Sequence, residues 1–111
     1  MATGIFPIPH AVSLWSQLGI PKTATTYNCN WQEYRTLIIT AVFYGNRLFS
    51  VEIPSTAFAS TASQNRPMLT VFNGNTFIAQ YEVWQNGNGK ITAKASAQNN
   101  AYGLLIEGFN L

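Results

Sequence analysis

Few side chains in this sequence could carry out chemistry. It contains one cysteine (Cys29), one histidine (His10), four glutamates and no aspartate. A nucleophilic triad needs a Ser or Cys, a His and an acid that orients the imidazole, so Cys29, His10 and a glutamate are the only thiol triad available. Cys29 stands between two asparagines and His10 follows an Ile-Pro pair. We interpret them as a small buried thiol and a solvated imidazole.

A pair of carboxylates could serve a glycosidase, and Glu52 and Glu82 are the natural couple. Both fall on the outward register of the strands predicted below, where a single glutamate usually solvates a sheet face. No Gly-x-Ser-x-Gly elbow supports a serine hydrolase. The sequence therefore predicts no catalytic residues and a protein that is not an enzyme.

Metal and phosphate sites have equally little support. Structural zinc needs four Cys or His ligands and catalytic zinc at least three protein ligands, which one Cys and one His cannot supply. Calcium loops rely on Asp and Glu, and the two Asn-Gly-Asn segments contain neither. The Asn-Gly-Asn-Gly run at 86–89 lacks the spacing of a phosphate-binding loop. We expect no metal and no cofactor.

The charge content is unusually low. Asp, Glu, Lys and Arg make up 9% of the chain, against roughly 25% in an average soluble domain, and polarity comes mainly from Asn, Gln, Thr and Ser. The six basic residues are scattered singly, whereas a nucleic-acid binder clusters them. A weakly charged surface repels its neighbours weakly, which suits a protein that sits against another protein.

No part of the sequence predicts a membrane or an export signal. No apolar run approaches the length that spans a bilayer, and the start lacks the basic region of a signal peptide. A single cysteine allows no intrachain disulfide. We expect a protein made and used in a cytoplasm, or in a particle assembled there.

The spacing of turn residues predicts an all-β fold. From Tyr34 onward, Gly, Pro and Asn clusters separate runs rich in β-branched and aromatic residues, which is typical of a sandwich or barrel. The predicted strands are 34–44, 47–53, 68–72, 76–85, 90–98 and 101–111. We expect one domain, with a β-sandwich core at 34–111 preceded by an arm and first edge segments at 1–33.

Alternation within the strands predicts which side chains face the core. The first strand is long and largely buried, and a two-residue loop at Gly45-Asn46 leads into a strand with Phe49, Val51 and Ile53 inside. Phe58 is expected to fold back onto the core. In the long strand at 76–85, one face is predicted to be core and the other to face outward or into a partner. The core set is Phe77, Ala79, Tyr81 and Val83, and the outer set is Ile78, Gln80, Glu82 and Trp84.

The first residues predict an extended apolar arm. Prolines 7, 9 and 21 interrupt a series of apolar residues, and such segments are poor central strands. A short helical turn over 12–18 is compatible with Leu14 and Leu18, which are one turn apart. Two alternatives stay open: the arm covers an open end of its own sandwich, or it reaches onto a neighbouring subunit.

Sugar binding is the main rival to a purely structural role. Flat aromatic faces and side-chain amides are the groups that bind hydroxyls, although aromatic residues in strands more often pack in the core. The aromatic candidates are Trp31, Tyr81, Trp84 and Tyr102.

Over its whole length the chain resembles the capsid decoration, or staple, proteins of short-tailed Salmonella phages of the epsilon-fifteen type. The resemblance rests on the length, the proline-bearing start IFPIPHAVSLW, the strand pair LIITAVFYGNRLFSVEIP, the Asn-Gly-punctuated strands and the ending GLLIEGFNL. It implies a jelly-roll-like antiparallel β-sandwich and a non-enzymatic homodimer on the outer surface of a virion. It also implies that the partner is the major capsid protein, whose subunits this protein would clamp.

That family has no signature residues to transfer, so the contact residues are inferred from this sequence. They are the apolar side chains of the arm and of the outer face of the long strand: Ile5, Phe6, Ile8, Leu14, Trp15, Ile78 and Trp84. Two further hypotheses stay open, a receptor-binding tip of a phage tail fibre and a carbohydrate-binding module.

Overall fold

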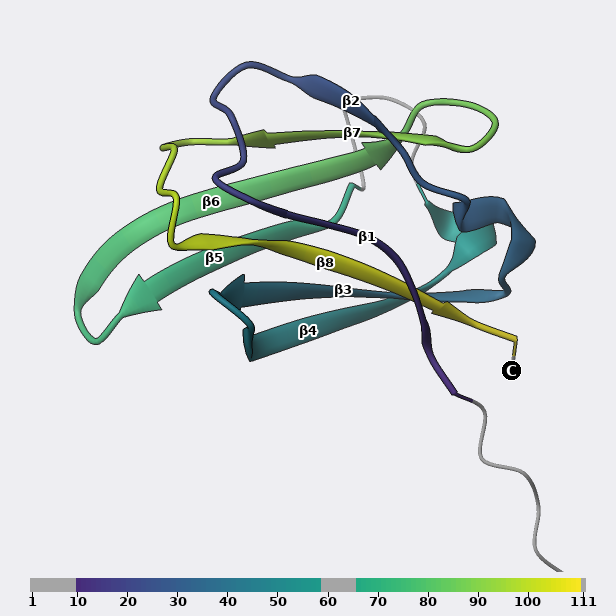
Figure 1. The fold of residues 1–111 in the computed structure, drawn as a ribbon, viewed down its shortest axis with the longest axis horizontal. Coiled ribbons are helices and arrows are strands. Elements are labelled where there is room, and N and C mark those ends of the chain that lie inside the picture. Colours follow the sequence, from purple (N-terminus) through teal and green to yellow (C-terminus); the bar gives the residue numbers. More distant parts are fainter. Residues whose placement is uncertain (1–9, 59–65, 111) are drawn as a thin grey trace, which may run out of the picture.

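The chain forms an antiparallel β-sandwich, as predicted. The computed structural model describes residues 10–58 and 66–110. Sheet A has the strand order β1-β8-β3-β4 and sheet B the order β2-β7-β6-β5. Figure 1 shows sheet B lying above sheet A. The strands are β1 (Val12–Leu18), β2 (Thr25–Asn28), β3 (Thr36–Phe43), β4 (Asn46–Pro54), β5 (Met68–Asn73), β6 (Thr76–Gln85), β7 (Lys90–Ala95) and β8 (Tyr102–Phe109). Two short 3-10 turns complete the described elements, η1 (Trp31–Glu33) and η2 (Ser55–Ala57).

Both sheets place alternate side chains in one shared core. The strand β3 lies between β4 and β8 and buries Leu37, Ile39 and Ala41 completely. In sheet B, Ala79, Tyr81 and Val83 of β6 are equally buried. Phe58, which follows η2, is also buried, as the sequence predicted. The core therefore forms between the two sheets because period-two alternation turns one face of each strand inward.

The segment before residue 34 contributes two edge strands. The strand β1 pairs with β8, and β2 pairs with β7. A helical turn at 12–18 is therefore wrong, because the backbone there is a strand that pairs with β8 at every residue except Leu14, where the register shifts. Ile5, Phe6 and Ile8, predicted to contact a partner, lie outside the described residues.

The strand β1 can pair closely with β8 because of a glycine. A Cβ atom at Gly103 would lie 1.9 Å from the Gln17 carbonyl oxygen and 2.7 Å from the Leu18 Cα. Any other residue at this position would push the two backbones apart. Gly103 therefore allows β1 to take its place beside β8 at the edge of sheet A.

The hairpin loop between β3 and β4 differs from the prediction by one residue. Phe43 pairs with Asn46, so the loop is Tyr44-Gly45 rather than Gly45-Asn46. Tyr44 has a φ of 53°, a conformation that L-residues other than Asn and Asp rarely adopt. Because Phe43 pairs with Asn46, the loop is limited to Tyr44 and Gly45. The residue with positive φ is therefore Tyr44, although Gly adopts positive φ more easily.

Candidate interaction surface

Exposed apolar side chains gather where two hairpins meet at one end of the sandwich. The β3–β4 and β5–β6 hairpins both turn at this end, and their side chains line a common hollow. We call this region the hairpin end. Its exposed apolar residues are Tyr44, Leu48, Phe49, Phe72 and Phe77, which are between 40% and 60% exposed.

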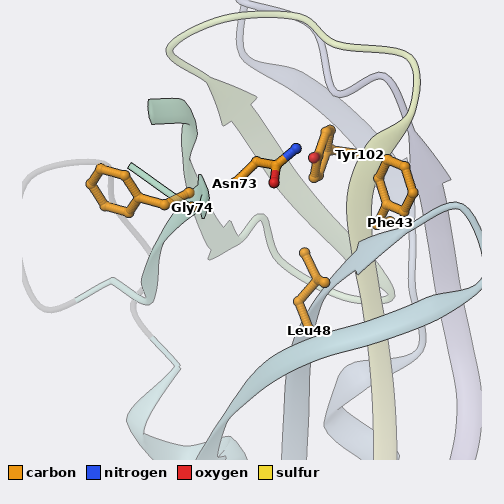
Figure 2. Close-up of a pocket in the computed structure, with 6 residues that line it drawn as sticks. Phe43, Leu48, Asn73, Gly74 and Tyr102 are labelled. Atoms are coloured by element: carbon orange, nitrogen blue, oxygen red, sulfur yellow. The ribbon is translucent and has the colours of Figure 1, made fainter. Parts of the chain in front are cut away.

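The hairpin end encloses a hollow of about 220 Å³. It is lined by Phe43, Leu48, Phe72, Asn73, Gly74 and Tyr102. Figure 2 shows Leu48 and Asn73 pointing into the space beside Phe43 and Tyr102. The ring centroids of Phe43 and Tyr102 are 4.8 Å apart, so the two packed rings form one wall of the hollow. Asn73 adds a neutral polar group to the lining. None of the described residues that line the hollow is charged, which suits an uncharged apolar ligand group.

Two β-bulges lie at the hairpin end, and the one on β6 explains why Phe77 is exposed. On β6, Ala79 pairs with Val71 but Phe77 pairs with Phe72, so Ile78 is an extra residue. A bulge interrupts the alternation of faces. Phe77, predicted to be core, is therefore 50% exposed, and Ile78, predicted to face outward, packs against the core. The rings of Phe72 and Phe77 meet edge to face with centroids 5.8 Å apart.

The second bulge lies in β4, where Leu48 is the extra residue between the pairs Ala41–Phe49 and Val42–Arg47. Phe49 was predicted to face inward together with Val51 and Ile53. The latter two are half-buried, but Phe49 is 40% exposed. Because β4 is the last strand of sheet A, nothing among the described residues covers the outer flank of these side chains.

The two Asn-Gly-Asn segments are turns, as predicted. Gly74, Gly87 and Gly89 all have positive φ values, which glycine adopts without strain. The loop at 86–89 is held by the segment before it: the Trp31 indole donates to the carbonyls of Gly87 and Lys90, and the Gly89 amide donates to Gln32 Oε1 at 2.9 Å. These asparagines and glycines shape the chain rather than forming a ligand loop.

The aromatic residues considered for sugar binding are mostly engaged within the protein. Tyr81 and Tyr102 are buried, and burial together with the nearby Tyr102 raises the pKa of Tyr81 to about 12. The Arg66 guanidinium lies 5.5 Å from the Trp84 ring centroid and pairs with Glu82 at 3.1 Å. Trp31 is partly buried, packs edge to face against Phe58 and borders a hollow of about 290 Å³.

Three of the predicted partner contacts, among them Ile78, are partly buried against the core of the sandwich. Leu14 and Trp15 lie against the core, and the Trp15 ring is 5.0 Å from that of Tyr27 on β2. Trp84 is half-buried on the outer face of sheet B. Whether any of them contacts a partner stays a prediction. The hairpin end was missed, although Phe72 and Phe77 flank an Asn-Gly turn and could have indicated an aromatic hairpin tip.

The residues weighed for catalysis lie on different elements, with Glu52 on β4 of sheet A and Glu82 on β6 of sheet B. Burial raises the pKa of the Cys29 thiol to about 12, so it is protonated near neutral pH and is a poor nucleophile. Glu82 pairs with Arg66, while Glu52 is exposed on β4. Across residues 10–58 and 66–110, no group of His, Cys, Asp or Glu could hold a metal ion.

One ion pair lies on the outer face of sheet A. The Arg47 guanidinium contacts both carboxylate oxygens of Glu107, with Nη2 to Oε2 at 2.9 Å. This hydrogen bonding holds the pKa of Glu107 below its ordinary value, although partial burial opposes the shift. Arg47 is thereby turned across the sheet face rather than along the free edge of β4.

Comparisons with known proteins identify no relative. No protein-family model, curated protein or solved structure matches this chain. No helix among the described residues is long and apolar enough to cross a membrane.

Proposed function

We propose that this protein is a non-enzymatic virion protein that decorates a bacteriophage capsid on its outer surface and clamps neighbouring major capsid subunits. The observation that carries the proposal is the hairpin end, where five apolar side chains are exposed and two of them, Leu48 and Phe72, line a hollow without charged groups among the described residues. Contiguous exposed apolar surface commonly marks a protein interaction site. The low charge and the resemblance to capsid staples support the same role, including the homodimer that the resemblance implies.

The energetics suit a clamp that is present in many copies. Burying one exposed apolar side chain contributes roughly 1–2 kcal/mol, since most of these side chains are already half covered. A few such contacts per subunit give modest affinity, and repetition over an icosahedral surface strengthens attachment through multivalency.

The test uses capsids that lack this protein, to which the purified chain is added back. We expect the unchanged chain to co-sediment with capsids and to raise the temperature at which they release DNA. The double variant Phe72→Ser, Phe77→Ser should bind at least tenfold more weakly while unfolding at nearly the same denaturant concentration. The matched control is Val12→Ser, which removes an exposed apolar side chain of β1 away from the hairpin end. Unchanged DNA retention with and without the protein would reject the clamp.

A carbohydrate-binding module or a tail-fibre tip is the second candidate, because one other hollow has the right groups. It is lined by an indole and neutral polar side chains: Trp31, Gln32, Ser55, Thr56, Phe58 and Gln85. The amide oxygens of Gln32 and Gln85 already accept bonds from Gly89 and Gly87, which leaves fewer groups for a sugar. Binding to host polysaccharide that is lost in Ser55→Ala, Thr56→Ala would favour this candidate over the clamp.

A further inference from the structure

The strand β4 is an edge whose protection against pairing is incomplete. Edge strands in soluble proteins are usually protected by lysines, prolines, bulges or covering segments. In β4 the bulge lies at Leu48 and the proline is the last residue, Pro54. The stretch Phe49–Ile53 contains neither, and no described strand lies beyond it.

The inward side chains of this stretch are covered on one flank only. Phe49 is 40% exposed, and Val51 and Ile53 are half-buried. On the matching edge of sheet B, the inward residues Leu69 and Val71 of β5 are each 1% exposed. The uncovered apolar flank therefore belongs to β4 and not to both edges.

The charge of the stretch points to the kind of segment that fits. Glu52 is exposed and forms no ion pair with any described residue, while the other charged residue of β4, Arg47, is bound to Glu107. Opposite charges directly across two strands stabilise their pairing, and like charges oppose it. A second copy of β4 would bring another Glu52 and no unpaired base, so a different chain fits better.

We propose that β4 accepts an extended segment of the partner protein as a fifth strand of sheet A. The segment carries apolar side chains opposite Phe49, Val51 and Ile53 and a basic side chain opposite Glu52. Strand addition of this kind draws affinity from main-chain hydrogen bonds and specificity from alternate side chains. The proposal rests on the proposed docking function, since β4 begins at the hairpin end and Leu48 belongs to both.

The experiment uses the full chain and two short synthetic peptides that alternate valine and threonine, one with a central lysine and one with a central glutamate. Amide exchange is followed residue by residue. We expect the lysine peptide to slow exchange in β4 and to bind about fivefold more tightly than the glutamate peptide, the size expected of a cross-strand charge pair. Glu52→Lys should reverse this preference.

The control variant is Glu33→Lys, which makes the same charge change in η1 and should keep the preference for lysine. Slowed exchange in β1, β2 or β5 instead of β4, or no preference between the peptides, would overturn the proposal. So would concentration-dependent protection of β4 in the free protein, which would identify a second copy as the occupant. Co-sedimentation with capsids that persists despite such a result would leave the clamp intact and reject only strand addition.

Discussion

The two long sides of the sandwich, formed by the edge strands β1 and β2 on one side and β4 and β5 on the other, are packed differently. On one side the edge strands β1 and β2 are joined by an aromatic contact, with Trp15 and Tyr27 5.0 Å apart. On the other side β4 and β5 carry the exposed side chains of Phe49 and Phe72, and Leu48 and Phe72 border a hollow. Large aromatic side chains are present on both sides. Among the described residues, only the first side has an aromatic contact that joins the edge strands of the two sheets, between Trp15 and Tyr27.

This difference indicates that one side serves stability and the other serves contact. Exposed apolar side chains in one region contribute little to folding, because water still reaches them. A monomer gains nothing from keeping them together, whereas a protein that docks does. We call the side with β1 and β2 the closed side and the side with β4 and β5 the open side. Substitutions on the closed side should lower the stability of the fold, and substitutions on the open side should weaken binding to the partner.

The largest effect is expected at Gly103, on the closed side. Gly103→Ala places a Cβ 1.9 Å from the Gln17 carbonyl oxygen, so β1 must move away from β8, and we expect a loss of about 3 kcal/mol in the free energy of unfolding. Gly45→Ala is the control, since a Cβ there meets no atom within 4 Å. Denaturant unfolding measures both. Equal stability of the two variants would show that β1 is not fixed by this contact.

A smaller effect is expected at Trp15. Trp15→Ala removes a half-buried indole from its contact with Tyr27 and should lower the free energy of unfolding by about 2 kcal/mol. Phe72→Ala, on the open side, should change it by less than about 0.5 kcal/mol. If Trp15→Ala instead left stability unchanged and abolished capsid docking, Trp15 would be the partner contact that its sequence position first indicated.

The smallest effect is a pH dependence at the Arg47–Glu107 pair. The folded pKa of Glu107 is below its ordinary value of 4.5, so its contribution is complete above that value and is lost as the pH falls through the folded pKa. Stability should therefore fall with acidification below about pH 4.5, and less steeply in Glu107→Gln. The difference should be modest, because Arg47 is well exposed to solvent. Identical slopes for the two proteins would contradict it.

Much of the fold could be predicted from the sequence because strand and turn signals are local. The strands β3, β6, β7 and β8 lie within the predicted runs, β4 exceeds its run by one residue at each end and β5 by one residue at its end, and Phe58 is buried as expected. The bulges could not be read in the same way, because they depend on how two strands pair. One extra residue at Ile78 was enough to exchange the expected positions of Phe77 and Ile78.

The contact surface was less predictable than the core. Leu14, Trp15 and Trp84 were singled out for their apolar character in unusual positions, yet Leu14 and Trp15 pack against the core, and Trp84 lies under Arg66. Among the exposed residues of the hairpin end, Tyr44 lies in a loop, and Leu48 and Phe77 lie at bulges that depend on strand pairing. Nothing in their local pattern distinguishes a strand in the middle of a sheet from one at its edge.

The sequence by itself determined an all-β chain, its turns, its low charge and the scarcity of groups that could do chemistry, because composition and alternation act within a few neighbouring residues. Tertiary structure alone decided the strand order, the bulges in β1, β4 and β6, and the choice of β4 and β5 as edges. The exposure of a side chain depends on whether another strand covers it. That covering strand comes from a distant part of the chain, so a local sequence pattern does not show whether it is present. The open side of this sandwich is therefore visible only in the folded molecule.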